Sequence, residues 1–353
     1  MTTTVSAERV RQFVTRALGA AGMPEADART VAGLMTEADL YGADGHGVFR
    51  TAHYVRRIRA GGVNLKPNIR IVSERAGMAL VDGDNGMGHL VMRFAARTAI
   101  EKARASGVAW VGVRMSNHAG PALLYARMAA DAGLCGLYFC VGNANHLAPW
   151  GGLELLLSTN PVAVAVPTLA EPVVLDMATT VAAYGKVKTY AQQGKPMPEG
   201  WMIDRQGRAL TDAARANDGL LLPLGGMEAG YKGYGLALVF GLLAGSLNGA
   251  AMGRDVIDFN ADDSSVTNTG HTIVAIDPAA FGDPDEFRRR VDGVVRDLRA
   301  AERLPGVERI TVPGERSAAK HAARAAAGVP IPDALKANLD KLAAELGIPA
   351  LEQ

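Results

Sequence analysis

The chain has 353 residues, of which 48% are hydrophobic, so it can bury a sizeable core, and its length suggests two lobes rather than one small domain. Its 37 basic and 36 acidic residues leave a formal net charge of +1, and no block of lysine or arginine stands out, which argues against nucleic acid as a partner. The N-terminus shows no basic region followed by an apolar run, and the longest apolar stretch, residues 236–244, is too short to cross a bilayer. We therefore expect a cytoplasmic protein without membrane contact.

Residues 1–67 are predicted to form the first part of a helical lobe. The Tyr-Gly pair at 41–42 ends the second of two helices, and a third helix runs over residues 46–59 until the glycine pair at 61–62 closes it. The apolar residues that recur at helical spacing in the first two helices are Val10, Phe13, Val14 and Leu18, followed by Val31, Leu34, Met35 and Ala38.

Residues 68–279 are predicted to form an α/β lobe, because short β-rich runs here alternate with helical patterns. The strand AWVGVRMS, the helix PALLYARMAADAG and the strand LCGLYFCVG make one strand-helix-strand unit. The other elements expected in this lobe are two strands, IRIVSE and MALVDGD, a helix over 89–105, strands at 162–167, 173–176 and 272–277, and a long apolar helix over 233–247.

Residues 280–353 turn helical again, in FRRRVDGVVRDLRAA and ALKANLDKLAAEL, and are predicted to pack back on the first lobe. The predicted fold class is therefore α/β. It combines a mixed sheet with flanking helices and a helical lobe formed from the N- and C-terminal segments.

The segment GADGHGVFR, residues 42–50, combines two groups that can act on a small acid. Gly45 and Gly47 leave His46 open to a ligand, and a position at the start of a helix disfavours the imidazolium, which suits a general acid or base. Arg50 lies one turn further along the same face, where its guanidinium could hold a carboxylate through two hydrogen bonds. A capping histidine beside a solvated arginine is the alternative interpretation.

The segment SNHAG, residues 116–120, places His118 after a predicted strand and before a helix. Ligands bind at the carboxyl ends of strands in α/β sheets, and a helix N-terminus there offers free N–H groups to anions. A turn histidine satisfied by the backbone is the alternative. The other five histidines have weaker contexts and are taken as structural or peripheral: His53, His89, His146, His271 and His321.

The familiar nucleotide and metal motifs are absent from the sequence. GDNGMGHL carries its glycines in the wrong order for a Rossmann fingerprint, and GGMEAGYKG lacks the Gly-Lys pair and the following serine or threonine of a phosphate loop. No CxxC or HExxH spacing occurs, so we expect no metal site. These residues alone indicate an α/β protein with two candidate histidines.

Taken in order, the motifs resemble those of the type-2 malate/L-lactate dehydrogenase family, which also includes ureidoglycolate, sulfolactate and diketogulonate oxidoreductases and the cyclic imino-acid reductases. The resemblance extends from about residue 6 to about residue 318. The segments that carry it are GADGHGVFR, SNHAG, APWGG, TNP, DMAT, a central Gly-Lys, PEGW, PLGG, KGYGLAL and VPGER. The family has its own nicotinamide-binding fold in place of a Rossmann domain, which accounts for the missing fingerprint.

The resemblance implies an oxidoreductase that moves a hydride between NAD or NADP and a small 2-hydroxy or 2-oxo carboxylate. By resemblance, His46 is the proton donor or acceptor and Arg50 the carboxylate anchor, while His118 belongs to the same cleft and is catalytic in some members and a cofactor contact in others. Members are dimers or larger, so we expect a homo-oligomer with a shared cleft. The residues expected to touch the dinucleotide are Gly120, Thr159, Asn160, Pro161, Asp176, Met177, Ala178, Lys232, Gly314 and Glu315.

Two positions depart from the family pattern. The family usually has Ser-His-Gly where this chain has Gly45-His46-Gly47, so a hydroxyl that could orient the histidine or bind substrate is missing. The imino-acid reductases carry an aspartate where Lys186 stands, in a relay with serine and histidine. Both changes argue against imine reduction. Lys186 is a candidate catalytic residue. The alternative interpretation is that it is an ordinary surface lysine.

Other functions stay open on the sequence alone. The nearest is a cyclic imino-acid (ketimine) reductase. One of another class is a non-catalytic dinucleotide-binding protein that kept the fold after losing the serine, and a metal-dependent hydrolase is more distant. The sequence does not decide the acid or the stereochemistry, nor NAD against NADP, because the acidic residue that reads the ribose in Rossmann proteins has no counterpart here.

Overall fold

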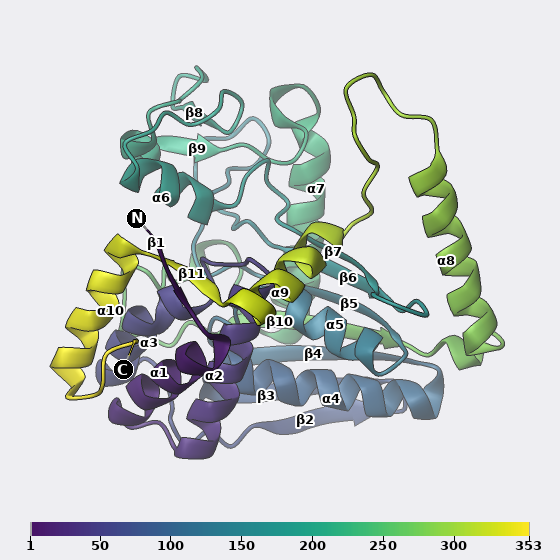
Figure 1. Cartoon of the computed structure of the whole chain (residues 1–353), viewed down its shortest axis with the longest axis horizontal. Coiled ribbons are helices and arrows are strands. Elements are labelled where there is room, and N and C mark those ends of the chain that lie inside the picture. The colour runs from purple at the N-terminus through teal and green to yellow at the C-terminus, as the bar shows by residue number, and fades with distance from the viewer. Residues whose placement is uncertain (1, 353) are drawn as a thin grey trace.

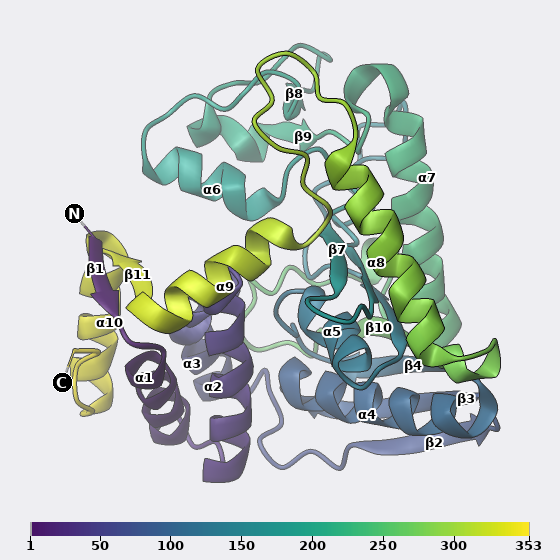
Figure 2. The ribbon, with the colours of Figure 1, turned by 45° about the vertical axis from the view of Figure 1, so that its right-hand side comes forward.

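The structure, a computed structural model, describes residues 2–352 and consists of a seven-stranded sheet with helices on both faces and a helical lobe beside it (Figures 1 and 2). The predicted fold class is confirmed, including the helical lobe made from the two ends of the chain. Within the described residues, no helix has the length and apolar character needed to cross a membrane.

The helical lobe joins the N- and C-terminal segments through one small ladder and one core. Its first helix begins at a serine cap, where Ser6 Oγ accepts a hydrogen bond from the amide of Arg9. Val5 pairs with Val329 across the ladder, and both side chains are buried in the core of the lobe. The elements are β1 (Thr2–Val5), α1 (Ala7–Ala20), α2 (Glu25–Leu40), α3 (Thr51–Arg59), β11 (Val329–Pro332) and α10 (Asp333–Leu346), with α9 (Glu315–Ala327) against α2.

The large sheet has the strand order β2-β3-β4-β10-β5-β6-β7. Strands β3 and β4 are parallel, and every other neighbouring pair is antiparallel. Among the strands of this sheet, β10 comes last in the sequence but lies between β4 and β5, so it separates the two strands of the predicted strand-helix-strand unit. The strands are β2 (Arg70–Arg75), β3 (Met78–Gly86), β4 (Val108–Ser116), β5 (Cys135–Cys140), β6 (Val162–Val166), β7 (Val173–Met177) and β10 (Thr269–Ile276).

Helices cover both faces of this sheet, as alternate side chains along β5 show. Tyr138 points into the core that lies under α4 (Gly88–Ser106) and α5 (Leu123–Asp131). Its neighbour Phe139 points to the opposite face, where it packs with residues of α7 (Gly226–Ala244). Because both faces are buried, the central strands are continuous apolar runs in the sequence.

A small unit between β7 and α7 has a core of its own and was not predicted from the sequence. Val187 of α6 (Tyr184–Gln192) packs there with Met202 of β8 (Met202–Asp204) and Leu221 of β9 (Gly219–Leu221). Strands β8 and β9 pair only with each other, and the unit stands at the top of Figure 1. Strands of three residues are too short to show a period in the sequence.

Two predicted segments differ from the structure. The third helix is predicted from residue 46, but residues 48–50 form a 3-10 turn and α3 begins at Thr51. Residues 280–353 are predicted to pack back on the first lobe, and α9, β11 and α10 lie there, whereas α8 (Pro284–Ala300) stands apart at the right of Figure 1 with only Val295 buried. The exposed side chains of α8 include the apolar Val294 and Leu298 beside many charged ones. The predicted domain boundaries at 67 and 279 stay a prediction.

Candidate active site

A column of four stacked rings joins the helical lobe to the sheet. The ring of His46, in the turn before α3, stacks on that of His118, in the segment after β4, with centroids 5.5 Å apart. His118 stacks in turn on Phe259 at 5.0 Å, and Phe259 stacks on His53 of α3 at 4.6 Å. The structure thus brings together the two histidines that the sequence singled out.

The guanidinium of Arg50 lies against this column. Its carbon Cζ is 5.3 Å from the centroid of the Phe259 ring. Its Nε donates a hydrogen bond of 2.9 Å to the carbonyl of Gly45, and its Nη1 donates one of 3.2 Å to Oδ1 of Asn260. These bonds fix the plane of the guanidinium, while Nη2 has no partner in the described part of the chain and can bind an anion.

Tyr54 of α3 orients His118 through a direct hydrogen bond. Its hydroxyl lies 2.6 Å from Nδ1 of His118, and the amide of Gly120 points to the same nitrogen at 3.4 Å. Burial raises the pKa of Tyr54 above its usual value, so the phenol keeps its proton and donates a hydrogen bond. Because Nδ1 accepts from two donors, the neutral ring carries its own proton on Nε2.

Both histidines of the pair are neutral at pH 7. Burial and the charge of Arg50 lower the pKa of His46 to about 4. The same two causes, together with His46 itself, hold the pKa of His118 well below its usual value. Since the His46 ring has no hydrogen-bond partner among residues 2–352, one of its nitrogens is free to accept a proton. The neutrality predicted from a helix end therefore has a different main cause, which is burial.

A third histidine, His89, lies beside this pair and was taken as peripheral from the sequence. It is fully buried near the start of α4, and neither ring nitrogen has a partner in the described part of the chain. The Tyr54 ring meets it edge to face at 5.7 Å, and a Cβ on Gly120 would lie 3.0 Å from its Nε2. Burial, with a smaller contribution from His46, lowers the pKa of His89 to about 3. His89 therefore packs as a neutral ring behind the reactive pair.

The turn that carries His46 rests on a buried carboxyl group. Asp39, at the end of α2, accepts a hydrogen bond of 2.8 Å from the amide of Val48, and burial raises its pKa to about 8. A Cβ on Gly47 would lie only 1.9 Å from Oδ1 of Asp39. A Cβ on Gly45 would meet nothing within 4 Å, so the position of the missing serine has room for a side chain.

The variant Gly47→Ala is expected to destabilise the protein by about 2–4 kcal/mol, because the new methyl group forces Asp39 away from the turn. The matched variant Gly45→Ala enters open space and is expected to change the stability by less than about 1 kcal/mol. Urea unfolding of both variants measures the difference. Equal free energies of unfolding would show that Asp39 is not held against the turn.

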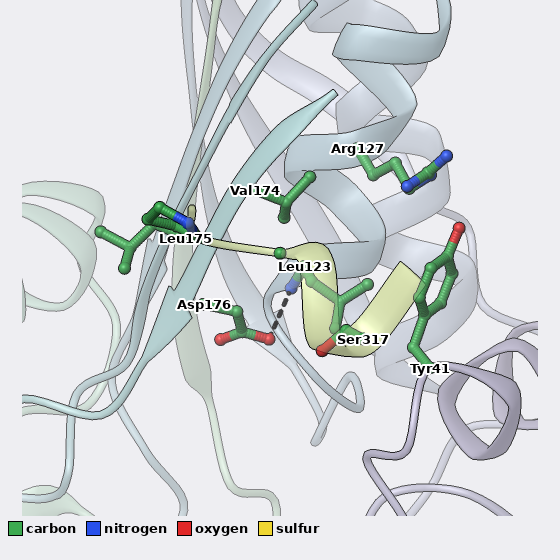
Figure 3. Close-up of a pocket in the computed structure, with 9 residues that line it drawn as sticks. Tyr41, Leu123, Arg127, Val174, Leu175, Asp176 and Ser317 are labelled. Carbon is green, nitrogen blue, oxygen red and sulfur yellow. Dashed lines mark hydrogen bonds between the residues drawn. The ribbon is translucent and has the colours of Figure 1, made fainter. Parts of the chain in front are cut away.

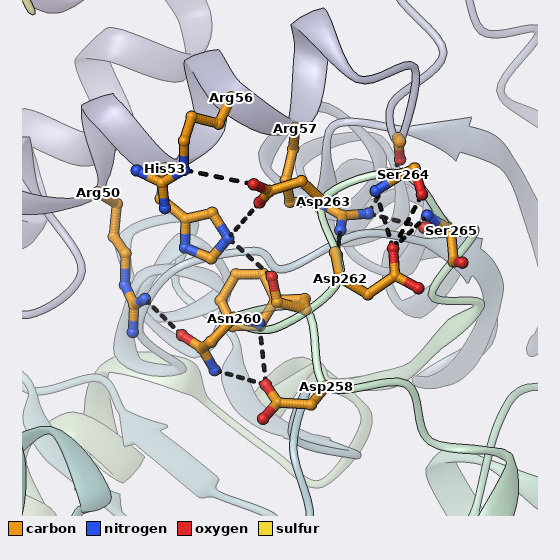
Figure 4. Close-up of polar contacts among 12 residues, drawn as sticks. Arg50, His53, Arg56, Arg57, Asp258, Asn260, Asp262, Asp263, Ser264 and Ser265 are labelled. Carbon is orange, nitrogen blue, oxygen red and sulfur yellow. Dashed lines mark hydrogen bonds and ion pairs between the residues drawn. The ribbon is translucent and has the colours of Figure 1, made fainter.

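A distant segment, residues 258–265, completes the site by binding to α3 (Figure 4). Arg57 donates hydrogen bonds to the carbonyls of Asp262, at 2.5 Å, and Ser265, at 2.9 Å. The carbonyl of Phe259 lies 2.8 Å from Nε2 of His53. These contacts fix the loop that supplies Phe259 and Asn260, two residues that the sequence analysis did not find.

Two lysines of α6 differ in their relation to the site. Lys186, the predicted catalytic lysine, is exposed. Among residues 2–352, no hydrogen bond or ion pair joins its side chain to His46, Arg50 or His118, and its catalytic role stays a prediction. The Nζ of Lys188 lies 3.5 Å from Oδ1 of Asn260, which also binds Arg50, and 5.6 Å from the ring centroid of Tyr184. It is Lys188 that reaches the contacts around the guanidinium.

Two of the ten predicted cofactor residues, Asp176 and Gly314, line a cavity of about 180 Å³ between β7, α5 and the start of α9 (Figure 3). Asp176 faces the cavity, and its Oδ2 accepts a hydrogen bond of 3.0 Å from the amide of Leu123. Partial desolvation raises the pKa of Asp176 to about 6. Gly314 lies opposite, where a Cβ would come within 2.9 Å of the backbone of Val174. Only glycine allows α9 to approach β7 so closely.

The segment Thr159 to Pro161 lies beside this region but is occupied by internal hydrogen bonds. The carbonyl of Thr159 accepts bonds from both the amide and the hydroxyl of Thr179. Asn160 is fully buried, accepts from the amide of Gly142 at 3.1 Å and donates to the carbonyl of Ala237 at 2.8 Å. Asn160 therefore shapes the loop and leaves the backbone, rather than its own amide group, to meet a ligand.

The other predicted cofactor residues occupy different surroundings. Met177 pairs with Val162 in the sheet, and Ala178 follows it, half-buried. Glu315 forms ion pairs with Arg299, at 2.5 Å, and with Arg309. Lys232 is exposed on α7 and is not among the residues that line the Asp176 cavity.

The mixed sheet without a Rossmann fingerprint, the histidine pair beside a guanidinium and the separate cavity are the arrangement expected of a hydroxy-acid dehydrogenase of the non-Rossmann class. The family model described as malate/L-lactate dehydrogenase matches residues 5–340. The chain therefore belongs to that family. The predicted family and enzyme class are confirmed, and so is NAD or NADP as the cofactor at the level of the family.

Individual relatives agree over nearly the whole chain. A malate dehydrogenase of Pyrococcus horikoshii is 39% identical over 352 residues, which cover 98% of this chain and 96% of the relative. The ureidoglycolate dehydrogenase (NAD(+)) of Escherichia coli O157:H7 is 33% identical, with 93% of each chain covered. The solved malate dehydrogenase structure from Pyrococcus horikoshii OT3 has a TM-score of 0.91 at 36% identity and covers 99% of this chain and 97% of its own.

Proposed function

We propose that the protein transfers a hydride between NAD or NADP and a small 2-hydroxy or 2-oxo carboxylate of the malate or lactate type. The observation that carries this proposal is the Arg50 guanidinium beside the stacked rings of His46 and His118. A guanidinium binds a carboxylate, and a neutral imidazole next to it can take the proton of the neighbouring hydroxyl group.

In this mechanism the substrate carboxylate binds Arg50 through two parallel hydrogen bonds. His46, neutral and without a protein partner, accepts the proton of the C2 hydroxyl group. His118, with its proton on Nε2, donates a hydrogen bond to the same oxygen, and Tyr54 holds it in that tautomer. In the reverse direction protonated His46 returns the proton to the oxygen as the 2-oxo group is reduced. The protein thus orients the acid and moves one proton.

The proposed position of the dinucleotide is beside β7. Asp176, Gly314 and Ser317 line the cavity there, and the positive end of the α9 dipole would attract the phosphates. The close approach of Gly314 to Val174 leaves no room for a side chain, as expected where backbone borders a ligand. When bound, the nicotinamide supplies the hydride acceptor or donor.

The direct test is to follow the absorbance of reduced nicotinamide with purified protein, NADH or NADPH, and a panel of 2-oxo acids and cyclic imino acids. Oxidation with a 2-oxo acid supports the proposal and names the cofactor. Oxidation with cyclic imines alone would make the protein a ketimine reductase. Tight binding of the dinucleotide without turnover on any substrate would identify a non-catalytic binding protein. Glycine at position 45 and lysine at position 186 argue against ketimine reductase activity.

We also propose that the protein is at least a homodimer and that a neighbouring subunit completes the cleft. Helix α7 exposes an apolar stripe and carries no charged residue after Lys232, a surface typical of an interface. The stripe consists of Met227, Tyr231, Leu236, Val239 and Leu242, each 40–54% exposed.

The variant Val239→Glu is expected to convert the dimer to a monomer, because a buried unpaired carboxylate costs several kcal/mol. Sedimentation equilibrium at micromolar concentration measures the mass. The control Val108→Glu, at a 49% exposed position at the start of β4, is expected to leave the mass unchanged. A wild-type protein that is already monomeric, or a dimer that survives Val239→Glu, would contradict the assignment of this interface.

A further inference from the structure

Two cations converge on one neutral amide group next to the histidine pair. Arg50 Nη1 lies 3.2 Å and Lys188 Nζ 3.5 Å from Oδ1 of Asn260. Within residues 2–352, neither cation has a carboxylate within 4.0 Å. Since like charges repel and a single carbonyl oxygen neutralises neither of them, this arrangement is one that bound anions would stabilise.

The carboxylate of Asp258 lies close enough to favour the charged forms of both Arg50 and Lys188, but it forms no direct ion pair with either in the described part of the chain. Asp258 accepts hydrogen bonds of 2.9 Å from both the backbone amide and the Nδ2 of Asn260. The Asn260 side chain therefore lies between this carboxylate and the cations, with its amino group toward Asp258 and its oxygen toward Arg50 and Lys188 (Figure 4 shows the Arg50 side of this contact). Burial and Arg50 lower the pKa of Lys188, with Asp258 opposing them.

The proposed function assigns one anionic group to Arg50, and Lys188 then remains for another. We propose that Lys188 binds a second carboxylate of the substrate, so that the protein prefers 2-oxo and 2-hydroxy acids that are dicarboxylates. The inference rests on the proposed function and narrows its substrate class. An ammonium group on a flexible stem suits a terminal carboxylate whose position varies with chain length, whereas the rigid guanidinium fixes the carboxylate beside the reacting carbon.

The test compares two 2-oxo acids of four carbons that differ in the second carboxylate, oxaloacetate and 2-oxobutanoate. For the wild-type enzyme kcat/KM is expected to be at least about tenfold higher with oxaloacetate. Lys188→Met should lower kcat/KM for oxaloacetate by about ten- to a hundredfold, mainly through KM, and leave 2-oxobutanoate within about threefold, because one charge-assisted hydrogen bond is lost. Lys195→Met, at an exposed position just after the same helix, is the matched control and should change neither substrate.

A wild-type enzyme without preference, or a preference that survives in Lys188→Met, would overturn the inference. If no acid is turned over, the proposed function fails, and a binding measurement then decides this inference alone. Calorimetric titration with malate and with 2-hydroxybutanoate, in the presence of NAD or NADP, should show malate binding weakened about tenfold or more in Lys188→Met and not in Lys195→Met. Equal malate affinity in the wild type and Lys188→Met would overturn the inference on this route.

Discussion

Replacing His46 with alanine is expected to lower kcat by about two to four decades with the fold intact, the usual loss when a general acid or base is removed. The side chain is half-buried and has no protein hydrogen-bond partner in the described chain, so its removal breaks no structural bond. Turnover of the preferred acid with NADH or NADPH measures the effect, and circular dichroism checks the fold. Activity within tenfold of wild type would remove His46 from this role.

The pH dependence of kcat/KM tests the role of His46 as proton acceptor and donor independently. The pKa of His46 is lowered to about 4 by burial and by Arg50. For oxidation of the hydroxy acid, which needs the neutral ring, kcat/KM should hold near neutral pH and fall as the pH drops toward 4. For reduction, which needs the protonated ring, kcat/KM should fall as the pH rises above that value. A bound carboxylate offsets the charge of Arg50, so the pKa seen in kcat should lie higher than that seen in kcat/KM.

Two other histidines serve as comparisons for this prediction. His321 is not part of the ring column: its Nε2 lies 3.0 Å from Glu37 and its ring packs on Tyr41, so His321→Ala should keep the pH profile. His118→Gln keeps a hydrogen-bond donor near the substrate oxygen and should lose less activity than His46→Ala. If instead His118→Gln loses more and removes the pH-dependent limb, the proton acceptor is His118, and His46 is the hydrogen-bonding partner.

The second large effect is expected for Arg50→Lys, which should raise KM for the acid by about ten- to a hundredfold, with a smaller change in kcat. An ammonium group cannot reproduce the two parallel bonds of the guanidinium. It also cannot hold Gly45 and Asn260 at the same time, as Nε and Nη1 of Arg50 do. Steady-state kinetics with varied acid at saturating cofactor measures the change.

The control for this variant lies on the same side of the lobe. Arg56 of α3 is exposed and pairs with Asp263 at 3.3 Å, so Arg56→Lys keeps a surface ion pair and should leave KM unchanged. An unchanged KM in Arg50→Lys would contradict the carboxylate clamp. A rise in KM of similar size in both variants would indicate a general disturbance of α3 rather than the loss of an anchor.

Most helices and strands were predicted because the spacing of apolar residues within a segment largely determines its secondary structure. The helical spacing of apolar residues in α1 and α2 gave helices that end near the predicted positions, with Tyr41 at the end of α2. The β-rich runs appear as β2 to β7 and β10. The third helix begins late because the tertiary bond from Val48 to Asp39 favours a 3-10 turn over the first turn of an α-helix.

Only part of the candidate site could be predicted from the sequence. His46 and Arg50 stand out because their motif places them one turn apart between glycines, and His118 stands out at the end of a strand. Phe259 and Asn260 belong to an irregular loop without a motif, and tertiary bonds from Arg57 and His53 hold that loop against α3. Lys188 rather than Lys186 contacts Asn260 because of how α6 packs on its own small core, and no local sequence pattern predicts this packing.

By itself the sequence determined the fold class, the family and the pair His46 and Arg50, since each of these depends on the order and spacing of nearby residues. The tertiary structure decided which strand separates β4 from β5, which ring supports the histidines and which lysine reaches Asn260. These depend on contacts between segments far apart in the chain. Such contacts follow from burial and hydrogen bonding across the whole molecule. A single stretch of sequence therefore does not predict which distant segment it will contact.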